Sequence, residues 1–368
     1  RFNGLSFTER SVSPLASAET GSGNAIFGPN ANYMALVPER MTSTANGLVR
    51  EATAGFKQPF DNLTGFSNYS VDVAIGGPTA AIGASRNTQT LGGFVGGLGE
   101  RRVNTAPPSF LDASLGGAAV IQTDAVTNRM SATFNFANLA GDNYTLNFGD
   151  QTGQGGSSAF IDDNLFAARE SNQAVSTLNG APVTGTAFMV TANAVPVAAI
   201  DGVTPCACDF LKWGWWTGEM VDAANNRDRV HLATWVAGVV PTVALPATGT
   251  ASFSGHAIGN VVNGAAHYVA AGAYNQTWDF AKGTGVATIS GFDAVGSRVA
   301  GGITVNHALT GAGTAFVGGV PGNSVSGSFF RDATAASGVG VGGVFAINNN
   351  AGYQAAGTFA AKQPGAVQ

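Results

Sequence analysis

The stretch Thr250-Ala251-Ser252-Phe253-Ser254-Gly255-His256 shows the pattern that decides the fold. Apolar side chains alternate in it with hydroxyl-bearing ones, which is typical of a half-buried β-strand. Runs of strand character follow one another through residues 229–361, with Gly or Asn at nearly every break, and no helical period interrupts them. The other clear runs are 230–239, 266–269, 277–280, 286–292, 303–305, 314–317, 325–330, 343–347 and 355–359.

Eight to ten short strands in direct succession raise the question of how the edge strands are protected. Closing the sheet on itself removes its edges. Eight strands also give a barrel whose interior is just filled by side chains. We therefore predict an eight-stranded antiparallel β-barrel over residues 229–368, with a β-sandwich as the alternative.

Residues 106–228 carry a second, weaker strand pattern. Runs at 119–124, 130–136 and 144–148 are separated by turn residues, which indicates an antiparallel meander. Apolar residues at helical spacing favour one short helix at 161–171. We predict a small antiparallel middle β-domain here, so that the whole chain is mainly β.

The first 105 residues lack a clean period and contain many turn formers. The run Gly92-Gly93-Phe94-Val95-Gly96-Gly97-Leu98-Gly99 has too little side chain to pack as a helix, and it favours a loop or a strand close against another backbone. We predict an extended, irregular N-terminal region over 1–105 that has its own small sheet or is ordered by a partner. The expected domains are thus 1–105, 106–228 and 229–368.

The composition points away from the cytosol and from nucleic acids. Only 11% of the 368 residues are charged, four are lysines, and the net charge is −5; ordinary soluble domains have about 25% charged residues. No basic stripe suggests nucleic-acid binding, and no apolar run reaches the roughly 18 residues of a membrane helix. We expect an extracellular or outer cell-surface protein, and a processed chain or a fragment because it begins at Arg1.

The motifs of common chemistries are missing or lack their context. Gly338–Gly343 fits G-x-G-x-x-G, but a strand pattern follows it where a nucleotide site needs a helix. His231, His256, His267 and His307 lack the short spacing of zinc ligands. Asp162-Asp163-Asn164 lacks the surrounding calcium loop. We predict no catalytic residue, no metal site and no cofactor, and therefore not an enzyme.

The most distinctive local feature is the segment from Cys206 to Trp216. Cys206 and Cys208 are two positions apart and could form a strained disulfide, remain free buried thiols or bind a metal. In a strand Trp213 and Trp215 share one face and Trp216 points to the other. The three tryptophans are our candidate binding residues, as a stacking platform for sugars or a protein anchor; the alternative is a core plug between the middle domain and the barrel.

The closing stretch resembles the barrel domain of transferrin-binding protein B and related bacterial surface proteins. That family has a G-x-F-[FY]-G-P-x-A segment, then G-G-x-F, then a closing G-x-F-x-A-K. Arg331-Asp332 stand where the family usually has Gly-Pro, and the resemblance covers about 248–362. The matching residues are Gly327, Phe329, Phe330, Ala333, Gly342, Gly343, Phe345, Gly357, Phe359, Ala361 and Lys362.

Two functional hypotheses follow from the residues and the resemblance. The first is a non-catalytic bacterial cell-surface structural or interaction protein, which self-associates through its N-terminal extension or binds another surface protein. The alternative is a surface ligand-binding protein for haem, an iron-carrier protein or glycans. The barrel resemblance is the reason to consider haem or iron carriers.

Overall fold

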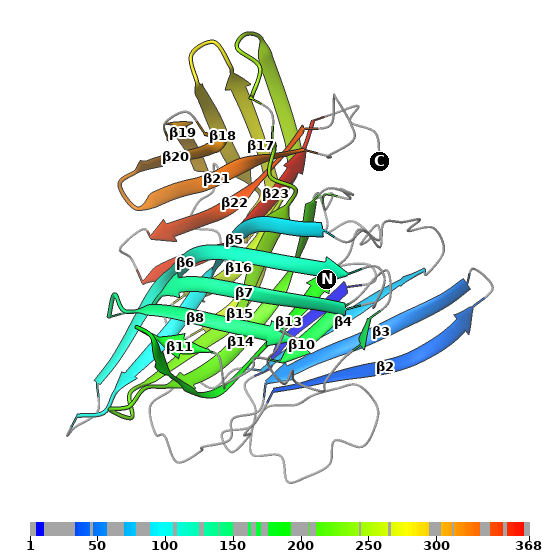
Figure 1. Cartoon of the computed structure of the whole chain (residues 1–368), viewed down its shortest axis with the longest axis vertical. Coiled ribbons are helices and arrows are strands. Elements are labelled where there is room, and N and C mark those ends of the chain that lie inside the picture. Colours follow the sequence, from blue (N-terminus) through cyan, green and yellow to red (C-terminus); the bar gives the residue numbers. More distant parts are fainter. Residues whose placement is uncertain are drawn as a thin grey trace.

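In the computed structural model, the described residues form β-strands and the turns that connect them (Figure 1). Among the described residues there is no helix, and hence none that could span a membrane. The described residues are 5–10, 34–44, 47–56, 70–78, 89–105, 109–124, 129–138, 140–149, 161–162, 167–170, 176–192, 206, 211–242, 244–263, 266–293, 303–310, 313–331, 339–348 and 352–363.

The N-terminal region contains a four-stranded antiparallel sheet in the order β1-β4-β3-β2. Of the two possibilities considered for this region, a small sheet of its own is the one observed. Its strands are β1 (Leu5–Arg10), β2 (Met34–Thr44), β3 (Gly47–Phe56) and β4 (Ser70–Pro78).

An eleven-stranded antiparallel sheet forms the middle of the molecule, in the order β12-β11-β8-β7-β6-β5-β15-β14-β13-β10-β9. It curls around a core of aromatic and aliphatic side chains that includes Phe134, Trp216 and Trp235. Its strands are β5 (Gln89–Val103), β6 (Ser109–Asp124), β7 (Arg129–Ala137), β8 (Asn143–Gly149), β9 (Ile161–Asp162), β10 (Ala167–Glu170), β11 (Thr177–Leu178), β12 (Ala181–Pro182), β13 (Thr184–Ala192), β14 (Leu211–Val221) and β15 (Arg227–Gly238).

The C-terminal third is a closed eight-stranded antiparallel barrel, as predicted. Closure comes from the pairing of its first strand with its last, with Ser254 opposite Lys362 and Asn263 opposite Tyr353. Its interior holds an aromatic core that includes Phe253, Phe329 and Phe359. Its strands are β16 (Thr250–Asn263), β17 (Ala266–Asp279), β18 (Thr284–Ser290), β19 (Ile303–Leu309), β20 (Ala315–Val320), β21 (Asn323–Arg331), β22 (Val339–Asn348) and β23 (Tyr353–Lys362).

The large sheet and the barrel pack directly on each other through β5 and β15 on one side and β16, β22 and β23 on the other. A hydrogen bond crosses this junction, where the backbone N–H of Leu98 donates to the side-chain oxygen Oδ1 of Asn260 at 3.3 Å. Gly96 lies against the backbone of Gly357. The glycine-rich run was predicted to form a loop or a strand close against another backbone, and the strand is observed.

A buried ion pair lies at one end of the large sheet, on its core side. Arg101 of β5 and Asp228 of β15 are register partners, and the guanidinium donates to the Asp228 carboxylate at 2.5 Å. The Tyr144 hydroxyl donates to the same carboxylate oxygen at 2.7 Å, and Arg101 also pairs with Asp222 at 3.1 Å. The polar cluster thus joins β5, β8 and β15 inside an otherwise apolar core.

Two sequence expectations differ from the structure. The helix predicted for 161–171 is wrong: β9 and β10 lie there, because β10 finds backbone hydrogen bonds on β13 that outweigh the local helical spacing. The run at 230–239 lies in β15 and pairs with β14 and β5, outside the barrel. The division into domains at 105/106 and 228/229 stays a prediction.

Candidate ligand groove on the barrel

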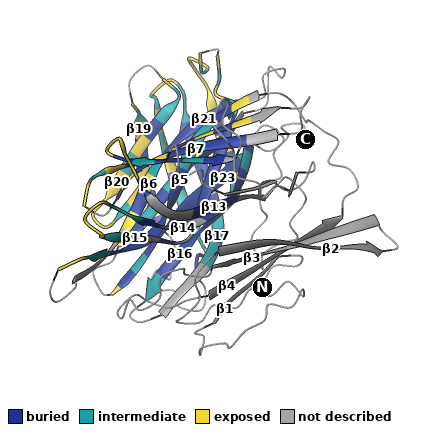
Figure 2. Cartoon of the chain, turned by 60° about the horizontal axis from the view of Figure 1, so that its bottom comes forward, coloured by how far each residue is buried: buried dark blue, intermediate teal, exposed yellow. Residues whose placement is uncertain are grey.

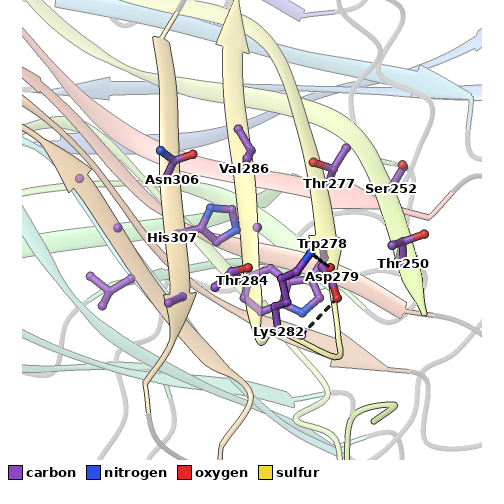
Figure 3. A pocket seen from close by; sticks show the side chains of 16 residues that line it. Thr250, Ser252, Thr277, Trp278, Asp279, Lys282, Thr284, Val286, Asn306 and His307 are labelled. Carbon is purple, nitrogen blue, oxygen red and sulfur yellow. Dashed lines mark hydrogen bonds and ion pairs between the residues drawn. The ribbon is translucent and has the colours of Figure 1, made fainter. Parts of the chain in front are cut away.

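A groove crosses the outside of five barrel strands, β16 to β20, close to the turn between β17 and β18 (Figure 3). Its volume is about 740 Å³. β18, β19 and β20 lie on the side of the barrel away from the large sheet (Figure 1), and exposed residues gather on β19 and β20 (Figure 2). β16 lines the groove with its first residues, Thr250 to Ser252, and meets the large sheet further along, at Asn260. The groove is therefore open to a partner that approaches the molecule from outside.

Strand register arranges the outward-facing residues of the groove in two rows. In the first row Ser252 is opposite Thr277, Thr277 opposite Val286, and Val286 opposite Asn306. The second row runs in the same way through Thr250, Asp279, Thr284, Ala308 and Val317. Neighbouring positions in a row are one strand spacing apart, about 4.8 Å. The groove thus offers hydroxyl and amide groups at regular intervals with valine side chains between them.

An inward-facing row supports the groove from below. Gly285 is the register partner of both Trp278 and His307, whose ring centroids are 5.1 Å apart. A Cβ atom on Gly285 would lie 2.4 Å from Trp278 Cε3 and 2.8 Å from His307 Nε2. Glycine at this position leaves the space that the two rings need.

His307 is neutral in this environment. Its side chain is 3% exposed, and desolvation lowers the pKa of the imidazole, an effect that a backbone hydrogen bond to Val305 partly offsets. His307 Nδ1 lies 3.3 Å from the carbonyl oxygen of Val305, so Nδ1 carries the proton. No lining hydroxyl is hydrogen-bonded to His307 or Asp279 in the described part of the chain, so no nucleophile and base are paired here.

The two charges in the groove neutralise each other. Lys282 Nζ donates to Asp279 Oδ2 at 2.7 Å, and the backbone N–H of Lys282 donates to Oδ1 at 3.1 Å. These hydrogen bonds lower the pKa of the Asp279 carboxyl and the side-chain bond raises the pKa of the Lys282 ammonium. Both groups are therefore charged at neutral pH, with opposite signs. Within the described residues no cluster of three or more potential metal ligands exists.

The predicted tryptophan site lies elsewhere. Trp213 is buried at the junction, where its ring centroid is 4.7 Å from that of His256 in the barrel. Trp216 is buried on the other side of β14, where its ring centroid is 5.0 Å from that of Phe136 in the large-sheet core. The side chain of Trp215 lies outside the described residues. The structure places Trp213 and Trp216 in two different packed interiors, and a shared binding role for the three stays a prediction.

The cysteine segment also reaches the junction. Cys206 is buried and disulfide-bonded, and its backbone N–H donates to His256 Nδ1 at 2.8 Å. Burial lowers the pKa of His256 to about 3, so the ring is neutral and accepts this hydrogen bond. Cys208 lies outside the described residues, and a disulfide between Cys206 and Cys208 stays a candidate pairing.

Sequence reasoning missed the groove residues themselves. The signal was present in the hydroxyl-bearing positions of the alternating runs, such as Ser252 and Thr277. What brings them together is the pairing between strands, which a local pattern does not contain. The prediction that a strand and not a helix follows the glycine motif is confirmed, because β22 (Val339–Asn348) continues beyond Gly343.

Comparison with known proteins finds matches among solved structures only. No protein-family model matches the chain, and no curated protein does. Among solved structures, two mutants of transferrin binding protein B from Haemophilus parasuis Hp5 are 12% identical to the chain, with TM-scores of 0.30 and 0.31. A structure of intact Ap-TbpB with N and C lobes is also 12% identical, with a TM-score of 0.30. Each match covers 96% of this chain and 92% of the other. The closed eight-stranded barrel that the sequence resemblance implied is present in the structure.

Proposed function

We propose that this chain is a non-catalytic bacterial cell-surface binding protein, and that the groove over β16–β20 is its binding surface. The observation that carries the proposal is the groove itself: two rows of outward-facing polar and valine side chains on the barrel wall that the large sheet leaves open. The same strands bury a tightly packed aromatic core, so the groove lies on a rigid support.

The sequence resemblance to bacterial surface proteins supports the location. The low charge of the chain agrees with it, since 11% of the residues are charged. The chemistry of the groove supports binding over catalysis, because its histidine is neutral and buried and its carboxylate is held by a lysine. Such groups can position a ligand, but they supply no activated nucleophile.

The test uses the full chain, fluorescently labelled, on intact animal and bacterial cells in flow cytometry. Ala308 is exposed and lies in the second row between Thr284 and Val317, so Ala308→Trp fills the groove. Ala137 is exposed at the end of β7 in the other sheet, and Ala137→Trp is the matched control. Wild type and the control should bind at least one cell surface, and Ala308→Trp should bind at background. Equal binding by both variants, or binding by no protein, contradicts the proposal.

A separate experiment in the producing bacterium tests whether the chain is located at the cell surface. Added protease should digest the chain on intact cells while a cytosolic marker survives. Digestion only after lysis contradicts a cell-surface protein.

Self-association is a second candidate function, favoured by one observation. Among the described strands β1 and β2 are the edges of the four-stranded sheet, and each pairs on one side only. Open strand edges accept strands from another chain. We propose that the N-terminal sheet contributes to assembly of several copies at the cell surface.

A further inference from the structure

We propose that the barrel groove binds a neutral oligosaccharide in extended form. This inference rests on the proposed function and specifies the ligand class of the same groove. Three properties of the lining residues lead to it: their charge, their unused hydrogen-bonding capacity and their spacing.

The charge of the groove excludes strongly ionic ligands. Asp279 and Lys282 form a close ion pair at 2.7 Å and cancel each other, and His307 is neutral. The other described lining residues carry hydroxyl, amide or apolar side chains. A phosphate, sulfate or polycarboxylate ligand would find no unpaired counter-charge here. An uncharged ligand needs no counter-charge and can therefore bind to such a surface.

The hydroxyl and amide groups of the groove are available to a ligand. In the described part of the chain, no side-chain hydrogen bond within the protein occupies five of them. These five are Thr250, Ser252, Thr277, Thr284 and Asn306.

The outer face of β7 and β8 has the same residue types in a different state. There the Thr133 hydroxyl donates to Asn147 Oδ1 at 2.8 Å, and the Thr145 hydroxyl donates to Asn135 Oδ1 at 2.9 Å. The hydroxyl and amide groups of that face are hydrogen-bonded to one another, whereas those of the five described groove residues point outward without such bonds. Sugar hydroxyls both donate and accept, so they complement such a row.

Apolar side chains interrupt the polar rows. Val286 and Val317 are 37% and 49% exposed, so their aliphatic carbon is accessible to a ligand. The faces of a sugar ring carry C–H groups that pack on aliphatic carbon. One strand spacing of about 4.8 Å is close to the length of one sugar unit. Four spacings across five strands give a track of roughly 19 Å, long enough for several linked rings.

The pairing of the barrel strands argues against an extended peptide as the ligand. A peptide that adds as a strand needs an open sheet edge. Each strand from β16 to β20 is hydrogen-bonded to a neighbour on both sides, so the groove offers side chains and no free backbone ladder. Recognition here must therefore act through side-chain groups, which suits a polyhydroxylated ligand.

The direct test screens the full chain against immobilised oligosaccharides of glucose, galactose, mannose and N-acetylglucosamine, with sulfated and sialylated chains beside them. Titration calorimetry then measures the affinity for the best soluble oligosaccharide. We expect binding to a neutral chain, little change in affinity between low and high salt, and loss of binding in Ala308→Trp. Binding only to sulfated or sialylated chains, or to none, overturns the proposal.

Smaller changes test the individual polar groups. Thr277→Val and Asn306→Ala should each weaken binding roughly two- to tenfold, the range for one lost hydrogen bond. Thr145→Val, on the self-paired face, is the matched control and should leave the affinity unchanged. Circular dichroism and thermal unfolding show that each variant is folded. Wild-type affinity in both groove variants contradicts the assignment of these residues.

Mild periodate oxidation separates this inference from the proposed function. Periodate cleaves vicinal diols of sugars and should abolish binding of the chain to cells. If cell binding survives periodate but is still lost in Ala308→Trp, the groove remains the binding surface and the oligosaccharide is the wrong ligand class.

Discussion

Gly96 of β5 faces the carbonyl oxygen of Gly357 in β23, and a Cβ atom on Gly96 would lie 2.7 Å from that oxygen. Val344 Cγ1 would lie at 2.8 Å from the same Cβ. The oxygen cannot move away easily, because β23 is paired with β16 on one side and β22 on the other. The missing side chain at position 96 is therefore a condition for the large sheet and the barrel to pack together.

Gly96→Ala should lower the free energy of unfolding by about 1–3 kcal/mol, the usual cost of overpacking. Denaturant unfolding followed by tryptophan fluorescence measures the change. Gly116→Ala is the control, because a Cβ at this exposed position would meet no atom within 4 Å. Alanine there should leave stability unchanged or raise it slightly, since it restricts the unfolded chain. Equal losses in both variants would contradict the close-approach explanation.

The buried pair of Arg101 and Asp228 leads to a second prediction. Arg101→Met leaves the Asp228 carboxylate without its cation inside the large-sheet core. Breaking a buried pair in this way should cost about 3–5 kcal/mol. The measurement is again equilibrium unfolding, with Lys282→Met as the control because the Asp279–Lys282 pair is exposed. The control should unfold like the wild type, and a similar loss in both variants would show that burial is not the cause.

His256 should make the stability of the protein fall in acid. Its pKa is lowered to about 3 in the folded chain and is about 6.5 when the chain is unfolded. Between these pH values the unfolded chain binds more protons, so stability is complete above pH 6.5 and falls as the pH drops toward 3. His256→Gln keeps an acceptor for the Cys206 N–H but does not titrate.

Unfolding curves at several pH values between 4 and 8 isolate this contribution. Below pH 6.5 the wild type should lose up to about 1.4 kcal/mol per pH unit more than His256→Gln. Carboxylates such as Asp222, whose pKa is also lowered, affect both proteins alike. Parallel curves for the two proteins would show that His256 titrates normally in the folded chain.

The barrel could be predicted from sequence because its evidence is local. Alternation within a run such as 250–256 has a period of two, and each turn residue marks a strand end without reference to the rest of the chain. The large sheet could not be predicted in the same way. It places β5 between β6 and β15, so that Arg101 meets Asp228 across 127 positions of sequence.

The tryptophan segment also shows that a local sequence pattern does not reveal contacts between distant segments. Alternation correctly placed Trp213 and Trp216 on opposite faces of their strand. A surface strand would then expose one of the two. Both side chains are buried because β14 lies between the barrel and the large-sheet core, and this layering depends on contacts between distant segments.

Deletion of the N-terminal sheet tests self-association, and the structure decides where the deletion must end. Removing residues 1–105 would also remove β5 from the centre of the large sheet, where it pairs with β6 and β15. Removing residues 1–88 takes away β1 to β4 and leaves β5 intact. If the open edges of β1 and β2 join copies of the chain, light scattering after size-exclusion chromatography should show a large assembly for the full chain and a monomer for the truncated one. The truncated chain should keep its cooperative unfolding transition, and an unchanged particle size would exclude the N-terminal sheet as the assembly surface.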